Sequence, residues 1–127
     1  MKRNMDLILK ILRDLETHCR PSTKARVSQF SIVYKLNPAD YPECTEEELW
    51  EHSQLIVERK LAEINLQDRF GFSFTRLTWE GHDFVDNAQD ESIWNAAKKV
   101  AGNMSFGIFK TVLEQLALKT ALGTLGM

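Results

Sequence analysis

The chain has 127 residues and a net charge of −2, with 43% hydrophobic and 27% charged residues. This size and composition indicate one ordinary globular domain and exclude a disordered chain. No apolar run approaches the roughly 20 residues that span a bilayer, and the charged, amphipathic N-terminus is unlike a signal peptide, so we expect a cytoplasmic protein without membrane contact, whose cysteines Cys19 and Cys44 stay reduced.

The first predicted element is a helix from about Asn4 to His18. Asn4 is a suitable N-cap, and Asp6 lies in the first turn, where the helix dipole favours an anion. The apolar residues recur at spacings of three and four and form one stripe: Met5, Ile8, Leu9, Leu12 and Leu15. After a polar loop, apolar and polar residues alternate over 30–36 (FSIVYKL), which predicts a strand.

A second helix and a β-hairpin follow. The T-x-x-E signature of a capping box at residues 45–48 predicts a helix that runs to about Lys60. Alternation of apolar and polar residues over 62–67, a tight turn at 68–71 and a return over 72–79 predict the hairpin.

Three more helices are predicted after the hairpin. Their N-caps are small polar residues: Thr78, Asp90 or Ser92, and Ser105. The first helix runs to about Ala88 and the third to about Leu122. The second is expected to end at Gly102 in a left-handed conformation.

This order of elements predicts an α+β fold with the plan of a winged helix, in which helices back a three-strand sheet. A winged helix normally has two helices between its first strand and its hairpin, and the sequence shows one clearly. We expect a winged-helix-like domain over 1–102 and a C-terminal helical extension over 103–127.

Two blocks carry a resemblance to a known family: the opening MKRNMDLILKIL and the stretch RLTWEGHDFVDNAQDESIW (76–94). They are similar to the uncharacterised bacterial and phage family numbered 2513 among domains of unknown function. The block EEELWEHSQLIVERKLAEI resembles that family's helix-into-strand segment, with His52 at its recurrent histidine. Relatives tend to have Ala-Gly where this chain has Arg59-Lys60. The resemblance implies a small winged-helix-like protein of phage, prophage or bacterial origin and implies no catalytic residues.

The helix at 46–60 has an acidic stripe. It lies in an acidic part of the chain, because residues 36–68 carry nine acidic and two basic side chains. The stripe lies opposite the apolar residues Leu49, Ile56 and Val57. It consists of four side chains: Glu47, Glu51, Gln54 and Glu58. Carboxylates repel phosphates, so this helix is a poor reader of a DNA groove. The stripe is either an ordinary solvated face or a docking face for a basic protein. Trp50 beside it is either a half-exposed interface anchor or buried against the loop at 37–44.

Basic side chains are concentrated near the N-terminus, where residues 1–35 carry eight of them against three acidic ones. The candidates for contact with nucleic acid lie in the first helix, the following loop and the hairpin turn: Lys2, Arg3, Lys10, Arg13, Lys24, Arg26 and Arg69. No aromatic interleaving or Gly-rich motif accompanies them, so a solvated face is favoured over a nucleic-acid site.

No pattern of residues predicts catalysis, a cofactor or a metal. The spacing of His18, Cys19, Cys44 and His52 does not match a zinc site. The sequence contains no P-loop and no GxGxxG, HExxH or GxSxG motif. We therefore expect a protein that is not an enzyme.

Two further predictions concern apolar residues. The last helix is rich in them and predicts a homodimer through an antiparallel seam, with packing onto the first helix as the alternative. The seam residues are Phe109, Val112, Leu113 and Leu116. Trp79 and Phe84 are expected to seal the sheet to a helix, with Gly81 permitting their close approach.

The expected function is that of a small phage- or prophage-type modulator that acts through protein–protein contacts, with a protein partner and a second copy of itself. The alternative is a winged-helix DNA-binding regulator that uses the basic N-terminal region and the hairpin.

Overall fold

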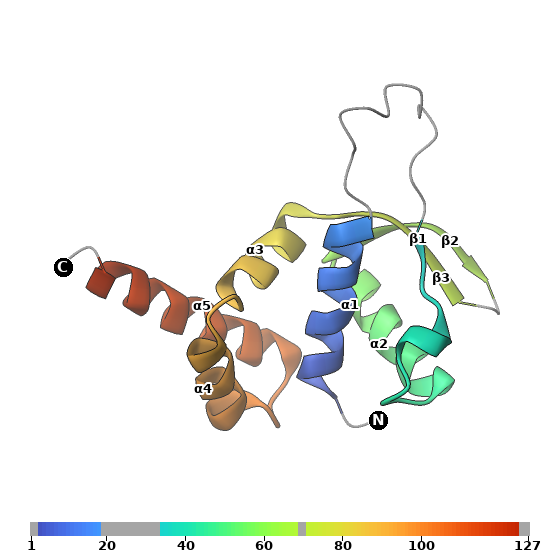
Figure 1. The fold of residues 1–127 in the computed structure, drawn as a ribbon. Helices are drawn as coiled ribbons and strands as arrows, with labels where there is room; N and C mark the ends of the chain where they lie inside the picture. Colours follow the sequence, from blue (N-terminus) through green and yellow to red (C-terminus); the bar gives the residue numbers. More distant parts are fainter. Residues whose placement is uncertain (1–2, 19–33, 69–70, 125–127) are drawn as a thin grey trace, which may run out of the picture. The chain divides into compact units, whose positions relative to one another are not determined.

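The structure, a computed structural model, describes residues 3–18, 34–68 and 71–124 (Figure 1). These residues form an α+β arrangement, as predicted. The elements in chain order are α1 (Met5–His18), β1 (Tyr34–Lys35), the 3-10 helix η1 (Pro38–Asp40), α2 (Glu46–Glu58), β2 (Ala62–Asp68), β3 (Gly71–Leu77), α3 (Trp79–Asn87), α4 (Glu91–Ala101) and α5 (Phe106–Thr124).

The chain divides into two compact units, Met1–His82 and Asp83–Met127. The division lies inside α3, whereas the sequence predicts a boundary after residue 102. The two units are therefore described separately below.

The sheet of the first unit is the β2–β3 hairpin with β1 at the other edge of β3. In the hairpin, Ala62 lies opposite Leu77, and β1 places Tyr34 opposite Phe74. The strand predicted over 30–36 is thus observed at Tyr34–Lys35, and residues 30–33 lie outside the described residues. The winged-helix arrangement stays a prediction.

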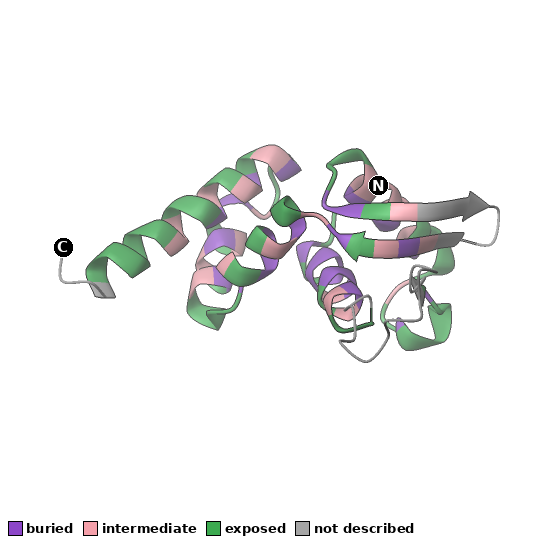
Figure 2. Cartoon of the chain, turned by 90° about the horizontal axis from the view of Figure 1, so that it is seen from above, coloured by how far each residue is buried: buried purple, intermediate pink, exposed green. Residues whose placement is uncertain are grey.

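α1 supplies much of the core of the first unit (Figure 2). Its N-cap is Asn4, as predicted, and the Asn4 side chain accepts a hydrogen bond from the backbone N–H of Leu7 at 3.1 Å. The predicted apolar stripe is buried together with Leu7 and Ile11. The helix contacts both α2 and β3.

α2 begins at the predicted capping box and ends two residues earlier than predicted. The Thr45 hydroxyl accepts from the N–H of Glu48, and the Glu48 carboxylate accepts from the N–H of Thr45, both at 3.1 Å. Lys60 then adopts a left-handed conformation with φ 56°. The N–H of Lys60 bonds to Val57 and that of Leu61 to Ile56, which is the Schellman pattern of a helix C-terminus.

His52 fixes the N-terminus of α1 to α2. Its ring is fully buried. Nε2 accepts a hydrogen bond from the backbone N–H of Asn4 at 2.9 Å, and Nδ1 lies 2.7 Å from the carbonyl oxygen of Glu48. Since Nε2 accepts, the ring is neutral and Nδ1 donates to that carbonyl.

We expect His52→Ala to lower the free energy of unfolding by about 2 kcal/mol, because it removes a fully buried ring together with both of its hydrogen bonds. Urea denaturation followed by circular dichroism measures this change. His82→Ala is the matched control, since His82 is half-exposed, and its cost should stay within about 0.5 kcal/mol. Equal costs for the two variants would show that the buried hydrogen bonds of His52 contribute nothing.

The second unit is built on well-capped helices. The Asp90 carboxylate accepts from the N–H groups of Ser92 and Ile93, and the Ser105 hydroxyl accepts from that of Ile108. The left-handed conformation predicted at Gly102 is wrong: its φ is −61° and its ψ −24°. Gly102 still donates to the carbonyl of Lys98, so it continues the right-handed turn.

Four aromatic rings from three helices form the core of the second unit. Phe84 of α3 has its ring centroid 5.9 Å from that of Trp94, 5.5 Å from Phe106 and 6.4 Å from Phe109. Trp94 meets Phe109 edge-on at 5.2 Å. Such tilted and edge-on contacts are favourable geometries for aromatic pairs.

This core changes the roles of two predicted dimer residues. Phe109 and Leu113 are fully buried within the chain. The first half of α5 fills the apolar centre of its own unit, so these two side chains are withdrawn from a dimer seam. Val112 and Leu116 are half-buried.

The prediction that Trp79 seals the sheet to a helix is wrong, because its side chain is 79% exposed. Phe84 is buried as expected. Residues five apart in a helix are about 140° apart around its axis, so Trp79 and Phe84 cannot both point inward from α3.

Candidate protein-interaction site

The predicted stripe on α2 lies on one side of the helix, opposite its buried residues. The buried side consists of Leu49, His52, Ser53 and Ile56. The acidic face of α2, as we call the outer side, consists of Glu47, Trp50, Glu51, Gln54 and Glu58. Glu47 and Glu58 are exposed, Glu51 and Gln54 are half-buried, and Trp50 is 40% exposed. The structure therefore brings all five candidates together on one accessible face.

The charge of this helix is of one sign. Residues 46–58 contain five glutamates and neither lysine nor arginine. Three of these glutamates lie in the first turn, where the helix dipole stabilises them. Glu51 and Glu58 lie beyond that turn, and Glu58 accepts a hydrogen bond from Gln54 at 3.2 Å. The dipole therefore accounts for the acids at the start of α2 and not for those further along.

The basic candidates are placed differently. Lys10 is committed within the chain, since its Nζ lies 2.9 Å from the Glu43 carboxylate, 2.8 Å from the Asp40 carbonyl and 4.7 Å from the Tyr41 ring centroid. The hydrogen bond from Lys10 holds the pKa of Glu43 below its usual value.

Of the other basic candidates, Arg3 and Arg13 are exposed. The remaining ones lie outside the described residues: Lys2, Lys24, Arg26 and Arg69. The described part of the chain thus contains three of the seven candidates, and one of them, Lys10, is paired with Glu43.

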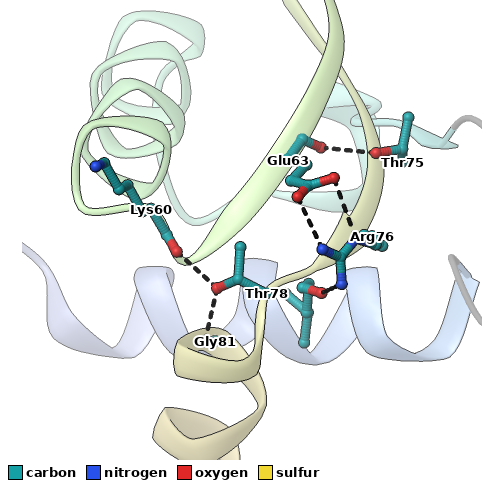
Figure 3. A network of polar contacts seen from close by, with 7 residues as sticks. Lys60, Glu63, Thr75, Arg76, Thr78 and Gly81 are labelled. Atoms are coloured by element: carbon teal, nitrogen blue, oxygen red, sulfur yellow. Dashed lines mark hydrogen bonds and ion pairs between the residues drawn. The ribbon is translucent and has the colours of Figure 1, made fainter.

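A hydrogen-bond network fixes the junction between β3 and α3 (Figure 3). Arg76 forms a two-pronged ion pair with Glu63 at 2.8 and 3.1 Å, and this pairing raises the pKa of the guanidinium. The Thr78 hydroxyl donates to the Lys60 carbonyl at 2.6 Å and accepts from the N–H of Gly81 at 3.1 Å. The network holds the start of α3 in place.

Trp79 follows directly after Thr78 and is the functional candidate that sequence reasoning missed. A tryptophan so exposed on a fixed helix start is a candidate contact residue. The sequence contains a sign of this exposure: Trp79 and Phe84 are five residues apart, so only one of them can face inward from the helix.

Cys44 lies in the loop between η1 and α2. The half-buried thiol donates to the Tyr41 carbonyl at 3.6 Å, and burial, together with Glu43 and Glu48, raises its pKa. The thiol therefore stays protonated and weakly nucleophilic at neutral pH.

Among residues 3–18, 34–68 and 71–124, no cluster of His, Cys, Asp or Glu side chains is arranged to hold a metal ion.

No helix in the described part of the chain has both the length and the apolar character needed to cross a membrane.

Comparison with known proteins gives two matches. A family described as "Hypothetical protein (DUF2513)" matches residues 2–107. An uncharacterized protein of Haemophilus influenzae is 28% identical to this chain over 120 residues, which is 92% of each chain. No solved structure matches the chain.

Proposed function

We propose that this chain, which belongs to the DUF2513 family of hypothetical proteins, is a non-enzymatic modulator that binds a basic protein through the acidic face of α2. The observation that carries this proposal is the combination of charge and exposure on α2. Its outer side presents Glu47, Glu51 and Glu58 without a lysine or arginine in the helix, beside a half-exposed Trp50. A tryptophan supplies the apolar anchor of an interface, and the surrounding charge steers and selects the partner.

The resemblance described from the sequence favours a phage or prophage origin. A phage-encoded modulator acts on proteins of its host, so the partner we propose is a host protein with a basic surface. The cytoplasm is the proposed place of action.

The proposed fold of the first unit is winged-helix-like. The sheet order β1-β3-β2 and the hairpin that follows α2 support it. η1 lies between β1 and α2, where a winged helix has its additional helix. In that arrangement α2 takes the place of the recognition helix, and its outward glutamates oppose contact with phosphates.

The alternative function is DNA binding by the basic N-terminal region. The exposure of Arg3 and Arg13 favours it. The ion pair between Lys10 and Glu43 weighs against it. We rank it second because the described residues include only three of the seven basic candidates, and Lys10 is one of them.

The test compares two triple variants in affinity capture from a bacterial lysate. Glu47→Gln, Glu51→Gln and Glu58→Gln together should lose the basic proteins that the wild type retains, and Trp50→Ala should weaken their retention. Glu80→Gln, Asp83→Asn and Glu91→Gln change the charge equally at exposed positions elsewhere and should leave capture unchanged.

A titration of random duplex DNA against salt is the second arm of the same test. We expect no measurable binding near physiological ionic strength. Binding that falls steeply with salt would favour the DNA-binding alternative. Equal loss of captured proteins from both triple variants would contradict the role of α2.

A further inference from the structure

Much of α5 is exposed (Figure 2), and its exposed side carries large apolar residues. Phe106, Phe109 and Leu113 are buried on the core side. Five residues at alternating spacings of three and four lie together on the other side. They form what we call the outer seam of α5: Ile108, Thr111, Gln115, Leu118 and Leu122.

The outer seam is accessible along its whole length. Ile108, Leu118 and Leu122 are 50%, 60% and 40% exposed, and Thr111 and Gln115 are also exposed. Isolated exposed apolar residues are common on protein surfaces. Three large ones in a single line over four helical turns, with Thr111 and Gln115 between the first and the second, are more than isolated residues and mark a candidate interaction surface.

The spacing of the seam identifies the kind of partner. Steps of three and four residues are those of positions a and d in a heptad repeat, which lets two α-helices pack along each other. In this frame Ile108, Gln115 and Leu122 take position a, and Thr111 and Leu118 take position d. A polar residue at a single a position, here Gln115, fixes the register of such a pair at some cost in stability.

The charges beside the seam indicate that the partner is a second copy of this chain and that the two α5 helices run parallel. Glu114 takes position g and Lys119 the following e position, and both are exposed. In a parallel pair of identical helices, residue g of one helix lies beside residue e, five positions on, of the other. Glu114 of each copy therefore meets Lys119 of the other copy, and two ion pairs form.

An antiparallel pair places g beside g and e beside e, so this complementarity is lost. Within the chain Glu114 lies 3.4 Å from Lys110. That exposed pair is weak, and Lys110 at position c does not block the seam.

We propose that the outer seam of α5 binds the same seam of a second copy of this chain in parallel. The proposal moves the dimer interface to the side of α5 opposite the seam predicted from the sequence. It is independent of the function proposed for α2, because it uses residues of the second unit only.

The first experiment is sedimentation of the full chain over a range of concentrations. A short seam with three apolar layers should give a monomer–dimer equilibrium with a Kd of about 10–500 μM. Leu118→Glu should weaken it at least about tenfold, because two carboxylates meet at a d position. Val100→Glu is the matched control, since Val100 in α4 is also 60% exposed, and it should dimerise like the wild type.

The second experiment reports direction, in a chain whose Cys19 and Cys44 are replaced by serine. A parallel pair brings each d position beside its own copy, so Thr111→Cys and Leu118→Cys should each form a disulfide-linked dimer when oxidised alone. An antiparallel pair would join the two variants only when they are mixed. Glu114→Lys should weaken the dimer, and adding Lys119→Glu should restore it.

Three results would overturn the proposal. They are a wild type that stays monomeric at about 500 μM, equal dimerisation of the Leu118→Glu and Val100→Glu variants, and disulfides that form only in the mixed sample. Circular dichroism of each variant verifies that the helices are intact, and a variant that has lost them is replaced by Leu118→Gln.

Discussion

Phe84→Ala is expected to lower the free energy of unfolding by about 3–5 kcal/mol, as large aromatic truncations in cores do. The Phe84 ring is buried among Trp94, Phe106 and Phe109. Its removal deletes three aromatic contacts and opens a cavity at the point where three helices meet. Urea denaturation followed by circular dichroism measures the loss.

Trp79→Ala is the matched control for this prediction, since it removes a larger ring from the same helix. Because the ring is largely in solvent, its loss should change the free energy of unfolding by no more than about 0.5 kcal/mol. If the Trp79 variant is as unstable as the Phe84 variant, the ring is covered in solution and its assignment as a contact residue is withdrawn.

Gly81→Ala is expected to destabilise the protein by about 3 kcal/mol, because overpacking against backbone cannot be relieved by a rotamer change. A Cβ atom at Gly81 would overlap the carbonyl oxygen of Leu61. That oxygen accepts the hydrogen bond from Thr78 that joins the start of β2 to the start of α3. Helix propensity alone predicts that this substitution stabilises the protein, because it favours alanine over glycine by about 1 kcal/mol.

Gly123→Ala gives the comparison for Gly81. Gly123 lies in α5, and a Cβ atom there meets no heavy atom within 4 Å. This variant should therefore be more stable than the wild type by up to about 1 kcal/mol. A Gly81 variant that melts at or above the temperature of the wild type would show that Leu61 can move aside without cost.

The features that the sequence predicts well are local ones. The N-caps of α1, α2, α4 and α5 are confirmed, because each depends on a hydrogen bond between residues two or three positions apart. The α+β class and the β2–β3 hairpin follow from the same short-range patterns. The resemblance read from two sequence blocks is confirmed by the family match over residues 2–107.

Backbone handedness was harder to predict. The sequence places a left-handed residue at Gly102, whereas the structure has one at Lys60. The Schellman turn there positions the buried Leu61 for entry into β2, so the requirement arises from the path of the chain. Lys60 therefore adopts the conformation that glycine favours, although it carries a side chain.

The candidate sites also differ in how well the sequence predicts them. The acidic face of α2 was predictable because its members and the buried residues lie in one helix and follow one period. The two sides of α5 were not, because both carry apolar residues. Only the positions of Phe84 and Trp94 decide which side faces the core.

The hydrogen bond between Asn4 and His52 joins residues 48 positions apart, and this separation has a consequence for the order of synthesis. At about 5–20 residues per second, His52 leaves the ribosome about 2–10 seconds after Asn4. During that interval the seven apolar side chains that α1 buries in the finished protein have neither α2 nor β3 to cover them. The first helix to be translated therefore waits for partners that are made later, and its apolar side is fixed only after α2 and β3 have left the ribosome.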